Sequence, residues 1–96
     1  MKLITKEIQK KLEANRGKEN ADPVVKFFTP YANATWYISE IDEDGDTLFG
    51  LCDLGIGFAE LGYVSLNELQ SIRGRFGLGV ERDLYWRPKS FEELQG

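Results

Sequence analysis

Hydrophobic and polar positions alternate with a period of two through the middle of the chain, as in β-strands with one buried face. The runs are rich in β-branched and aromatic residues and are separated by short polar or glycine-containing stretches. They span residues 24–29, 35–41, 47–52 and 58–65. The pattern therefore predicts a β-meander of three or four strands between Val24 and Ser65.

The alternation also predicts faces. In the run 35–41, Trp36 and Ile38 are expected on one face of the sheet. Tyr37 and Ile41 are expected on the other face, because successive side chains point to opposite sides of a strand. Aromatic residues on both faces indicate that helices or loops cover part of each side.

Two helices are predicted outside or at the end of the meander. Thr5 is a suitable N-cap for a first helix over residues 5–14, which carries a narrow apolar stripe. Ser65 and Glu68 form the spacing of a capping box before a short helix over residues 66–73. Gly74 is the expected C-terminal stop of that second helix.

The C-terminal part is less regular. Residues 75–80 are too glycine-rich for a helix and are expected to form an irregular connection. Residues 84–87 are predicted as a last strand closed by Pro88, and residues 90–93 repeat the capping pattern and open one turn of helix. The 96 residues are thus predicted to form a single α+β domain over residues 1–96, a small twisted antiparallel sheet of four to five strands packed with two short helices.

Charge is distributed unevenly along the chain. The net charge is −4, but residues 27–72 contain no Lys or Arg and eight Asp or Glu, whereas the flanking segments carry +3 and +1. Five of the acidic residues surround the expected turn between the second and third strands. They are Glu40, Asp42, Glu43, Asp44 and Asp46. This cluster is the candidate surface for a protein partner with a basic patch.

A second candidate site lies in the segment 73–89, where basic residues alternate with aromatic ones. Such a segment can bind an anion or single-stranded nucleic acid. The residues with this role would be Arg73, Arg75, Arg82 and Trp86. The overall acidity of the chain argues against strong nucleic-acid binding, because that affinity comes mainly from neutralising phosphates.

The sequence offers little for catalysis or metal binding. There is no histidine, and the single cysteine, Cys52, has no imidazole to activate it. Asp42, Asp44 and Asp46 have the first spacings of a calcium loop, with Asp53 at position twelve, but a threonine stands where that loop needs glycine. We therefore expect no catalytic residue, no metal site and no cofactor, and an Asp-rich hairpin turn explains the acidic run.

A series of motifs in order resembles a bacterial family of unknown function, the domain of unknown function number 2958. The motifs are Leu3–Ile8, Val25–Pro30, Thr35–Tyr37, Phe49–Leu51, Glu60–Leu69 and Glu81–Trp86. The likeness covers nearly the whole chain, and departs from the expected pattern at Gly79, where a proline is expected. The resemblance implies a bacterial cytoplasmic protein with an accessory role on plasmids or other mobile elements, and implies no activity or cofactor.

The sequence lacks an apolar leader and an apolar run long enough to span a membrane, so we expect a cytoplasmic protein without a membrane partner. The leading interpretation is a non-enzymatic interaction module that presents its acidic surface to a protein partner. The alternatives are the nucleic-acid or anion-binding segment described above, a small hydrolase, and an acidic face that is merely solvated.

Overall fold

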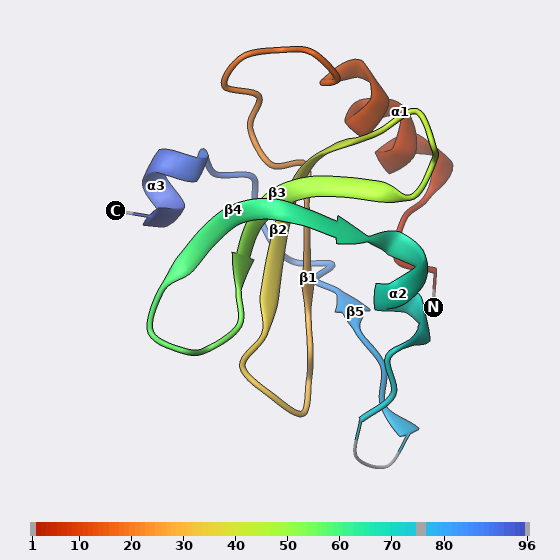
Figure 1. Cartoon of the computed structure of the whole chain (residues 1–96), viewed down its shortest axis with the longest axis vertical. Coiled ribbons are helices and arrows are strands. Elements are labelled where there is room, and N and C mark those ends of the chain that lie inside the picture. Colours follow the sequence, from red (N-terminus) through yellow and green to blue (C-terminus); the bar gives the residue numbers. More distant parts are fainter. Residues whose placement is uncertain (1, 75–76, 96) are drawn as a thin grey trace.

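The structure, a computed structural model, describes residues 2–74 and 77–95 and has the predicted α+β architecture (Figure 1). Five antiparallel strands form one sheet, and three helices pack around it. The strands are β1 (Val25–Phe28), β2 (Thr35–Ile41), β3 (Thr47–Asp53), β4 (Ala59–Ser65) and β5 (Glu81–Arg82). The helices are α1 (Lys6–Ala14), α2 (Leu66–Ser71) and α3 (Phe91–Gln95). The sheet order is β4-β3-β2-β1-β5, so the first four strands form the predicted meander.

A β-bulge in β2 sets the register of the sheet. Ile38 pairs with Gly50 and Glu40 pairs with Phe49, so Ser39 is an extra residue on the β2 side. The bulge shifts the alternation by one residue. Ile41 therefore lies on the same buried face as Ile38, and the prediction that Ile41 shares a face with Tyr37 was wrong.

The main core lies between one face of the sheet and the helices α1 and α2. Phe27, Trp36 and Ile38 from the central strands are buried against Leu12 of α1 and Leu69 of α2. The contacts between α1 and β2 hold the first helix over this face. The predicted apolar stripe of α1 thus faces the core as expected.

The opposite face of the sheet is covered only in part. Trp86 packs on Tyr37 with ring centroids 6.0 Å apart, and Phe49 packs on Tyr63 at 5.1 Å. Phe91 of α3 borders the same hollow as Phe49. Accordingly, α3 lies on the other side of the sheet from α1 and α2 (Figure 1). The prediction that both faces are partly covered is confirmed.

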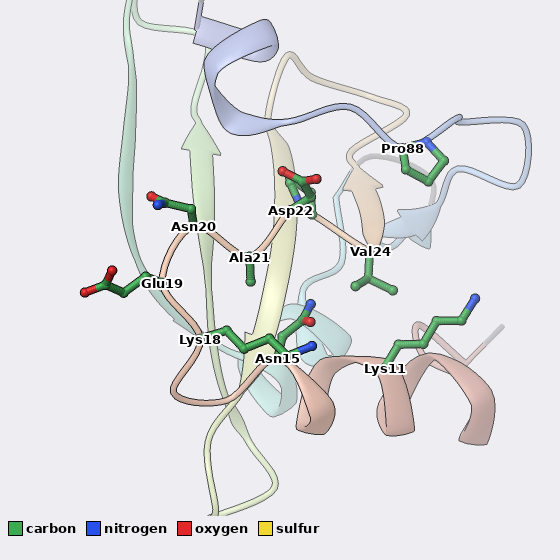
Figure 2. A pocket seen from close by; sticks show the side chains of 10 residues that line it. Lys11, Asn15, Lys18, Glu19, Asn20, Ala21, Asp22, Val24 and Pro88 are labelled. Carbon is green, nitrogen blue, oxygen red and sulfur yellow. The ribbon is translucent and has the colours of Figure 1, made fainter.

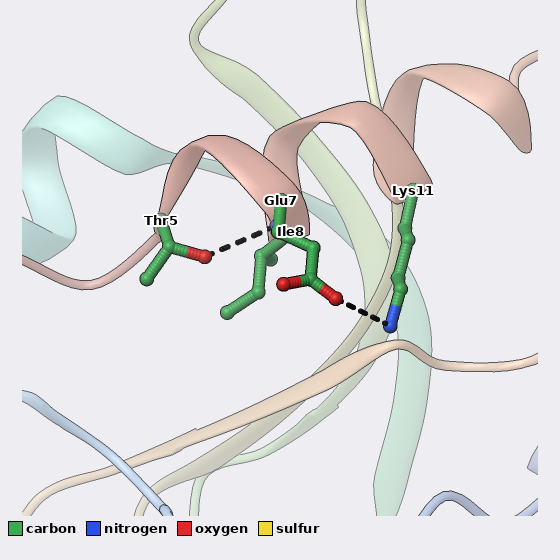
Figure 3. A network of polar contacts seen from close by, with 4 residues as sticks. All are labelled: Thr5, Glu7, Ile8 and Lys11. Atoms are coloured by element: carbon green, nitrogen blue, oxygen red, sulfur yellow. Dashed lines mark hydrogen bonds and ion pairs between the residues drawn. The ribbon is translucent and has the colours of Figure 1, made fainter.

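Helix α1 begins as its sequence predicts. The Thr5 hydroxyl accepts a hydrogen bond from the Ile8 amide at 3.1 Å, which satisfies one of the free N–H groups of the first turn (Figure 3). Glu7 and Lys11, one turn apart, form an exposed ion pair at 3.6 Å (Figure 3). Such a pair contributes little to stability, so the cap and the buried stripe hold the helix.

Helix α2 and the segment after it differ from the prediction. The helix ends at Ser71, because Ile72 is extended, and Gly74 is not its stop. Gly74 has another function: a Cβ atom there would overlap the ring of Tyr31, which lies against its backbone. The glycine therefore permits a close contact between two loops.

The last strand also lies elsewhere than predicted. Residues 84–87 form a turn and an irregular segment, and the strand that joins the sheet is β5. Asp83 is still beside β1, because its amide donates to the backbone oxygen of Lys26 at 2.9 Å and its carboxylate pairs with the Lys26 ammonium at 3.4 Å. The prediction placed the strand at Leu84 and Tyr85, but these two side chains are exposed in a turn. The terminal helical turn is confirmed as α3, with reciprocal hydrogen bonds between Ser90 and Glu93.

The close approach of β2 and β3 at the bulge generates a prediction. A Cβ atom at Gly50 would overlap the backbone oxygen of Tyr37, which cannot move without breaking the ladder. Gly50→Ala should lower the free energy of unfolding by about 3 kcal/mol, measured by urea denaturation.

Gly62 is the matched control, because it pairs with Gly50 across β3 and β4 and has open space where a Cβ would stand. Gly62→Ala should change the stability by no more than about 0.5 kcal/mol. Equal effects of the two substitutions would contradict the proposed close approach.

Candidate functional site

The acidic cluster surrounds the hairpin between β2 and β3. The Asp42 amide donates to the backbone oxygen of Thr47 at 2.8 Å, and the Gly45 amide donates to the backbone oxygen of Asp42 at 3.1 Å. Gly45 has a φ of 71°, which a glycine adopts without strain. The turn therefore connects two antiparallel strands, as predicted.

Asp44 holds the turn together. One carboxylate oxygen accepts from the amides of Asp46 and Thr47, both at 2.8 Å, and the other accepts from the Thr47 hydroxyl at 2.6 Å. These hydrogen bonds, that of the Thr47 hydroxyl above all, lower the pKa of Asp44, because they favour the ionised carboxylate. The carboxylate of Asp44 thus keeps its charge, but its oxygens are directed to the turn itself.

Asp46 links the hairpin to helix α2. Its carboxylate accepts from the Ser65 hydroxyl and from the Asn67 amide, both at 2.7 Å, and its backbone oxygen accepts from the Leu66 amide at 2.9 Å. Ser65 also accepts from the Glu68 amide at 3.2 Å, which confirms it as the N-cap. The sequence alone does not indicate this role of Asp46, because no local pattern connects Asp46 with Ser65 and Asn67, which are far from it in the chain.

The remaining acidic residues of the cluster are more available. Asp42 and Glu43 are exposed. The Asp42 carboxylate accepts a hydrogen bond from the amide of the next residue, Glu43, at 2.8 Å. Glu40 is half-buried on the strand and borders a hollow beside Phe49. The structure therefore brings the five carboxylates to one hairpin. Asp44 and Asp46 hold the fold, Asp42 and Glu43 are exposed, and Glu40 is half-buried on the strand.

The first helix brings a positive charge to this end of the sheet. Arg16 follows α1 and donates from its Nε to the backbone oxygen of Ile41 at 3.0 Å. Its charge also contributes, as the weakest of the causes, to lowering the pKa of Asp44. The neighbouring Asn15 donates to the Ser39 oxygen at 2.9 Å. Both polar residues satisfy backbone groups next to the bulge, a role that the sequence alone did not indicate.

The sheet register separates the other carboxylates. Asp53 lies at the far end of β3 from the hairpin, about 20 Å along a seven-residue strand, so it cannot be the twelfth ligand of a calcium loop. Glu40 pairs with Phe49 and Asp53 pairs with Thr35, so these two acids are not neighbours either. Within residues 2–74 and 77–95, no three His, Cys, Asp or Glu side chains are grouped as a metal would require.

The second candidate site is spread over the molecule. Arg82 pairs with Phe27 and donates to the backbone oxygens of Lys2 and Leu3, at 3.0 and 3.1 Å, so it fastens the N-terminal segment to the core side of the sheet. Trp86 lies on the opposite face against Tyr37.

The two other arginines of this site are placed differently. Arg73 is exposed and donates to the backbone oxygens of Gln70 and Ile72, at 2.8 and 2.7 Å. Arg75 lies outside the described residues. The structure therefore does not bring Arg82 and Trp86 to one surface.

A third feature is a hollow of about 460 Å³ between the end of α1, the loop that leads to β1 and Pro88. Lys11 of α1 and three charged residues of the loop line it, and Lys11 and Glu19 lie at opposite ends of the hollow (Figure 2). Cys52, the single cysteine, lies elsewhere, half-buried on the core face, where burial raises the pKa of its thiol. A thiol with a raised pKa is a weak nucleophile, so neither feature suggests catalysis.

None of the helices in the part of the chain that the structure describes is both long enough and apolar enough to cross a membrane. Residues 3–91 match a family described as "Protein of unknown function (DUF2958)", which confirms the resemblance seen in the motifs. No curated protein and no solved structure matches the chain.

The link between hairpin and helix predicts a coupled loss of stability. Ser65→Ala should lower the free energy of unfolding by about 1 kcal/mol and Asp46→Ala by about 1–2 kcal/mol, because each removes a cap of α2. The double variant should lose less than the sum, since the two side chains share a hydrogen bond. Urea denaturation measures all three, and exposed Glu43→Ala is the control, expected within about 0.5 kcal/mol of the parent.

Asp44 predicts a dependence on pH. Its pKa in the folded protein is below the ordinary value of 3.8, so its contribution to stability is complete above that value and is lost as the pH falls through the folded pKa. In Asp44→Asn this part of the acid dependence should be absent. Carboxyl NMR titration measures the pKa of Asp44 directly and should give a value below 3.8. A pKa at or above 3.8 would contradict the hydrogen-bond pattern.

Proposed function

Because the chain belongs to the DUF2958 family of proteins of unknown function, we propose its role from its own surface: it is a non-enzymatic interaction module that presents an acidic end of its sheet to a protein partner. The observation that supports this proposal is the grouping of five carboxylates at one hairpin, within residues 27–72 that contain no Lys or Arg. Positive charges also lie near the cluster: Arg16, whose Nε is engaged with the backbone of Ile41, and Lys18, which borders the same hollow as Glu40.

The division of the cluster indicates how recognition would work. Asp44 and Asp46 are held by the fold, so they provide fixed negative charge at low conformational cost. Asp42 and Glu43 are exposed beside them and can pair directly with basic side chains of a partner. Glu40 extends the charge along the strand. A preorganised acidic surface of this kind increases the association rate with a basic partner.

The chemistry of the partner follows from the charge. A surface that binds nucleic acid is basic, and an acidic hairpin can occupy such a surface in place of a phosphate backbone. We propose a nucleic-acid-binding protein as the partner, and an accessory role on a mobile element as the biological setting. Both rest on the charge pattern and on the resemblance described above.

The alternative function, binding of an anion or nucleic acid through residues 73–89, has less support. Arg82 is engaged with the N-terminal segment, and Trp86 is packed on Tyr37 across the sheet. This leaves Arg73 as the exposed arginine of the site within the described residues. Phosphate binding needs several converging positive charges, so the acidic surface remains the better proposal.

The test is a charge reversal that spares the fold. Asp42→Lys with Glu43→Lys changes two exposed carboxylates that hold neither the turn nor α2, and leaves Asp44 and Asp46 in place. Affinity capture from a bacterial lysate should lose at least nine-tenths of the specific partner, and the association rate with the purified partner should fall as salt rises.

The matched control is Glu13→Lys with Glu19→Lys, which makes the same change in net charge on exposed residues of α1 and the loop after it. Circular dichroism confirms that both variants are folded. Undiminished capture by the hairpin variant, or an equal loss in the control, would show that the acidic hairpin is not the binding surface.

A further inference from the structure

Strand β4 is an open edge of the sheet. It pairs with β3 on one side, and within the described residues no element pairs with its other side (Figure 1). The backbone N–H and C=O groups on that side are therefore available to another strand. At the opposite edge of the sheet the outer strand is β5, which is only two residues long and pairs with Phe27 and Phe28 of β1.

The register identifies which residues offer these groups. The Asp42 amide donates to the Thr47 oxygen, so Thr47 directs its backbone to β2. Hydrogen-bonded pairs alternate along an antiparallel ladder, so Leu48 directs its backbone to Val64 of β4. The same alternation turns the backbone groups of Leu61 and Tyr63 outward, away from β3.

The open edge is also apolar. Leu61 is 48% exposed and Tyr63 is 73% exposed, and both side chains lie on the face of the sheet that α3 only partly covers. The loop before β4 adds three more exposed apolar side chains. They are Leu54 at 55%, Ile56 at 66% and Phe58 at 58%. Edge strands of soluble proteins are usually protected by Lys, Pro or a bulge, and β4 contains none of these.

The negative charge around β4 indicates which kind of strand could pair with it. Glu60 is exposed on the alternate face of β4, and residues 27–72 contain no Lys or Arg to balance it. A second copy of this chain would bring two such acidic segments together, and like charges repel. A strand that carries basic residues beside Glu60 and apolar residues beside Leu61 and Tyr63 is complementary on both faces.

We propose that β4 binds an extended segment of a protein partner as a sixth strand of the sheet, and that this segment alternates apolar residues with Lys or Arg. This inference deepens the proposed function, on which it rests, by naming the form of the partner. Main-chain hydrogen bonds to Leu61 and Tyr63 provide affinity. The apolar and acidic neighbours on the two faces provide the choice of sequence.

The experiment uses the full chain, labelled with ¹⁵N, and an acetylated and amidated peptide that alternates Val and Lys over seven residues, the length of β4. In the free protein the outward amides of Leu61 and Tyr63 should exchange with solvent faster than those of Gly62 and Val64. The Val–Lys peptide should slow the exchange of the outward pair, and its binding should weaken as salt rises.

Three controls isolate the features of the peptide and the edge. A Val–Glu peptide tests the charge and should not bind. In a strand added to β4, the valines would stand opposite Leu61 and Tyr63, because directly opposite residues have their side chains on the same face of the sheet. N-methylation of these valines keeps the charge and the side chains of the peptide but removes the N–H groups that would donate to β4. This peptide should therefore bind at least about tenfold more weakly. Leu61→Pro, which removes an outward amide, should weaken binding about tenfold more than Leu61→Ala.

The outcomes separate this inference from the proposed function. Equal binding of the plain and N-methylated peptides would overturn strand addition. Chemical-shift changes confined to residues 42–46 would also overturn it, but would leave the acidic surface as a binding site. No binding of the Val–Lys peptide overturns the inference, whereas the capture experiment decides the function independently. Sedimentation that shows a dimer disrupted by Leu61→Lys would assign the edge to a second copy and also overturn it.

Discussion

The extra residue at Ser39 is the constraint on which the rest of the structure depends. By inserting one residue into β2, the bulge returns Ile41 to the buried face and aligns the hairpin with β3. The two strands then approach so closely that only a glycine fits at position 50. The backbone oxygens beside the bulge need donors, and Asn15 and Arg16 provide them from the end of α1. The bulge thus sets which side chains of β2 after residue 39 are buried, and the end of α1 is hydrogen-bonded to the sheet beside it.

The carboxylates of the acidic hairpin both stabilise the fold and give this surface its negative charge. Asp44 and Asp46 satisfy amides of the turn and of α2, so their charge is part of the fold. An acidic residue near the N-terminus of a helix is favourable, because free N–H groups and the helix dipole attract negative charge. The charge nevertheless remains at the surface beside Asp42 and Glu43. A surface that is already ordered by the fold loses little entropy on binding, which is why the same residues can hold the protein together and offer a partner a fixed target.

The two faces and two edges of the sheet are used differently. One face is sealed by α1 and α2, and the other is partly covered by Trp86 and α3. One edge is covered by β5, and the other, β4, remains open with apolar side chains around it. The open edge and the acidic hairpin both belong to the meander, so the segment without basic residues carries both surfaces to which we assign binding.

The local features of the fold could be predicted from neighbouring residues: the meander, the turn at Gly45, and the N-caps at Thr5 and Ser65. The α+β class follows from the kinds and order of these elements. The sequence also predicted that the acidic residues gather at one hairpin. Other features depend on residues far apart in the sequence and are seen only in the folded protein. The bulge reversed the expected face of Ile41, α2 ended before its glycine, and the last strand formed at β5 because β1 offered it a ladder. The separation of Arg82 from Trp86 and the open edge of β4 follow from strand order, which no local pattern of side chains encodes.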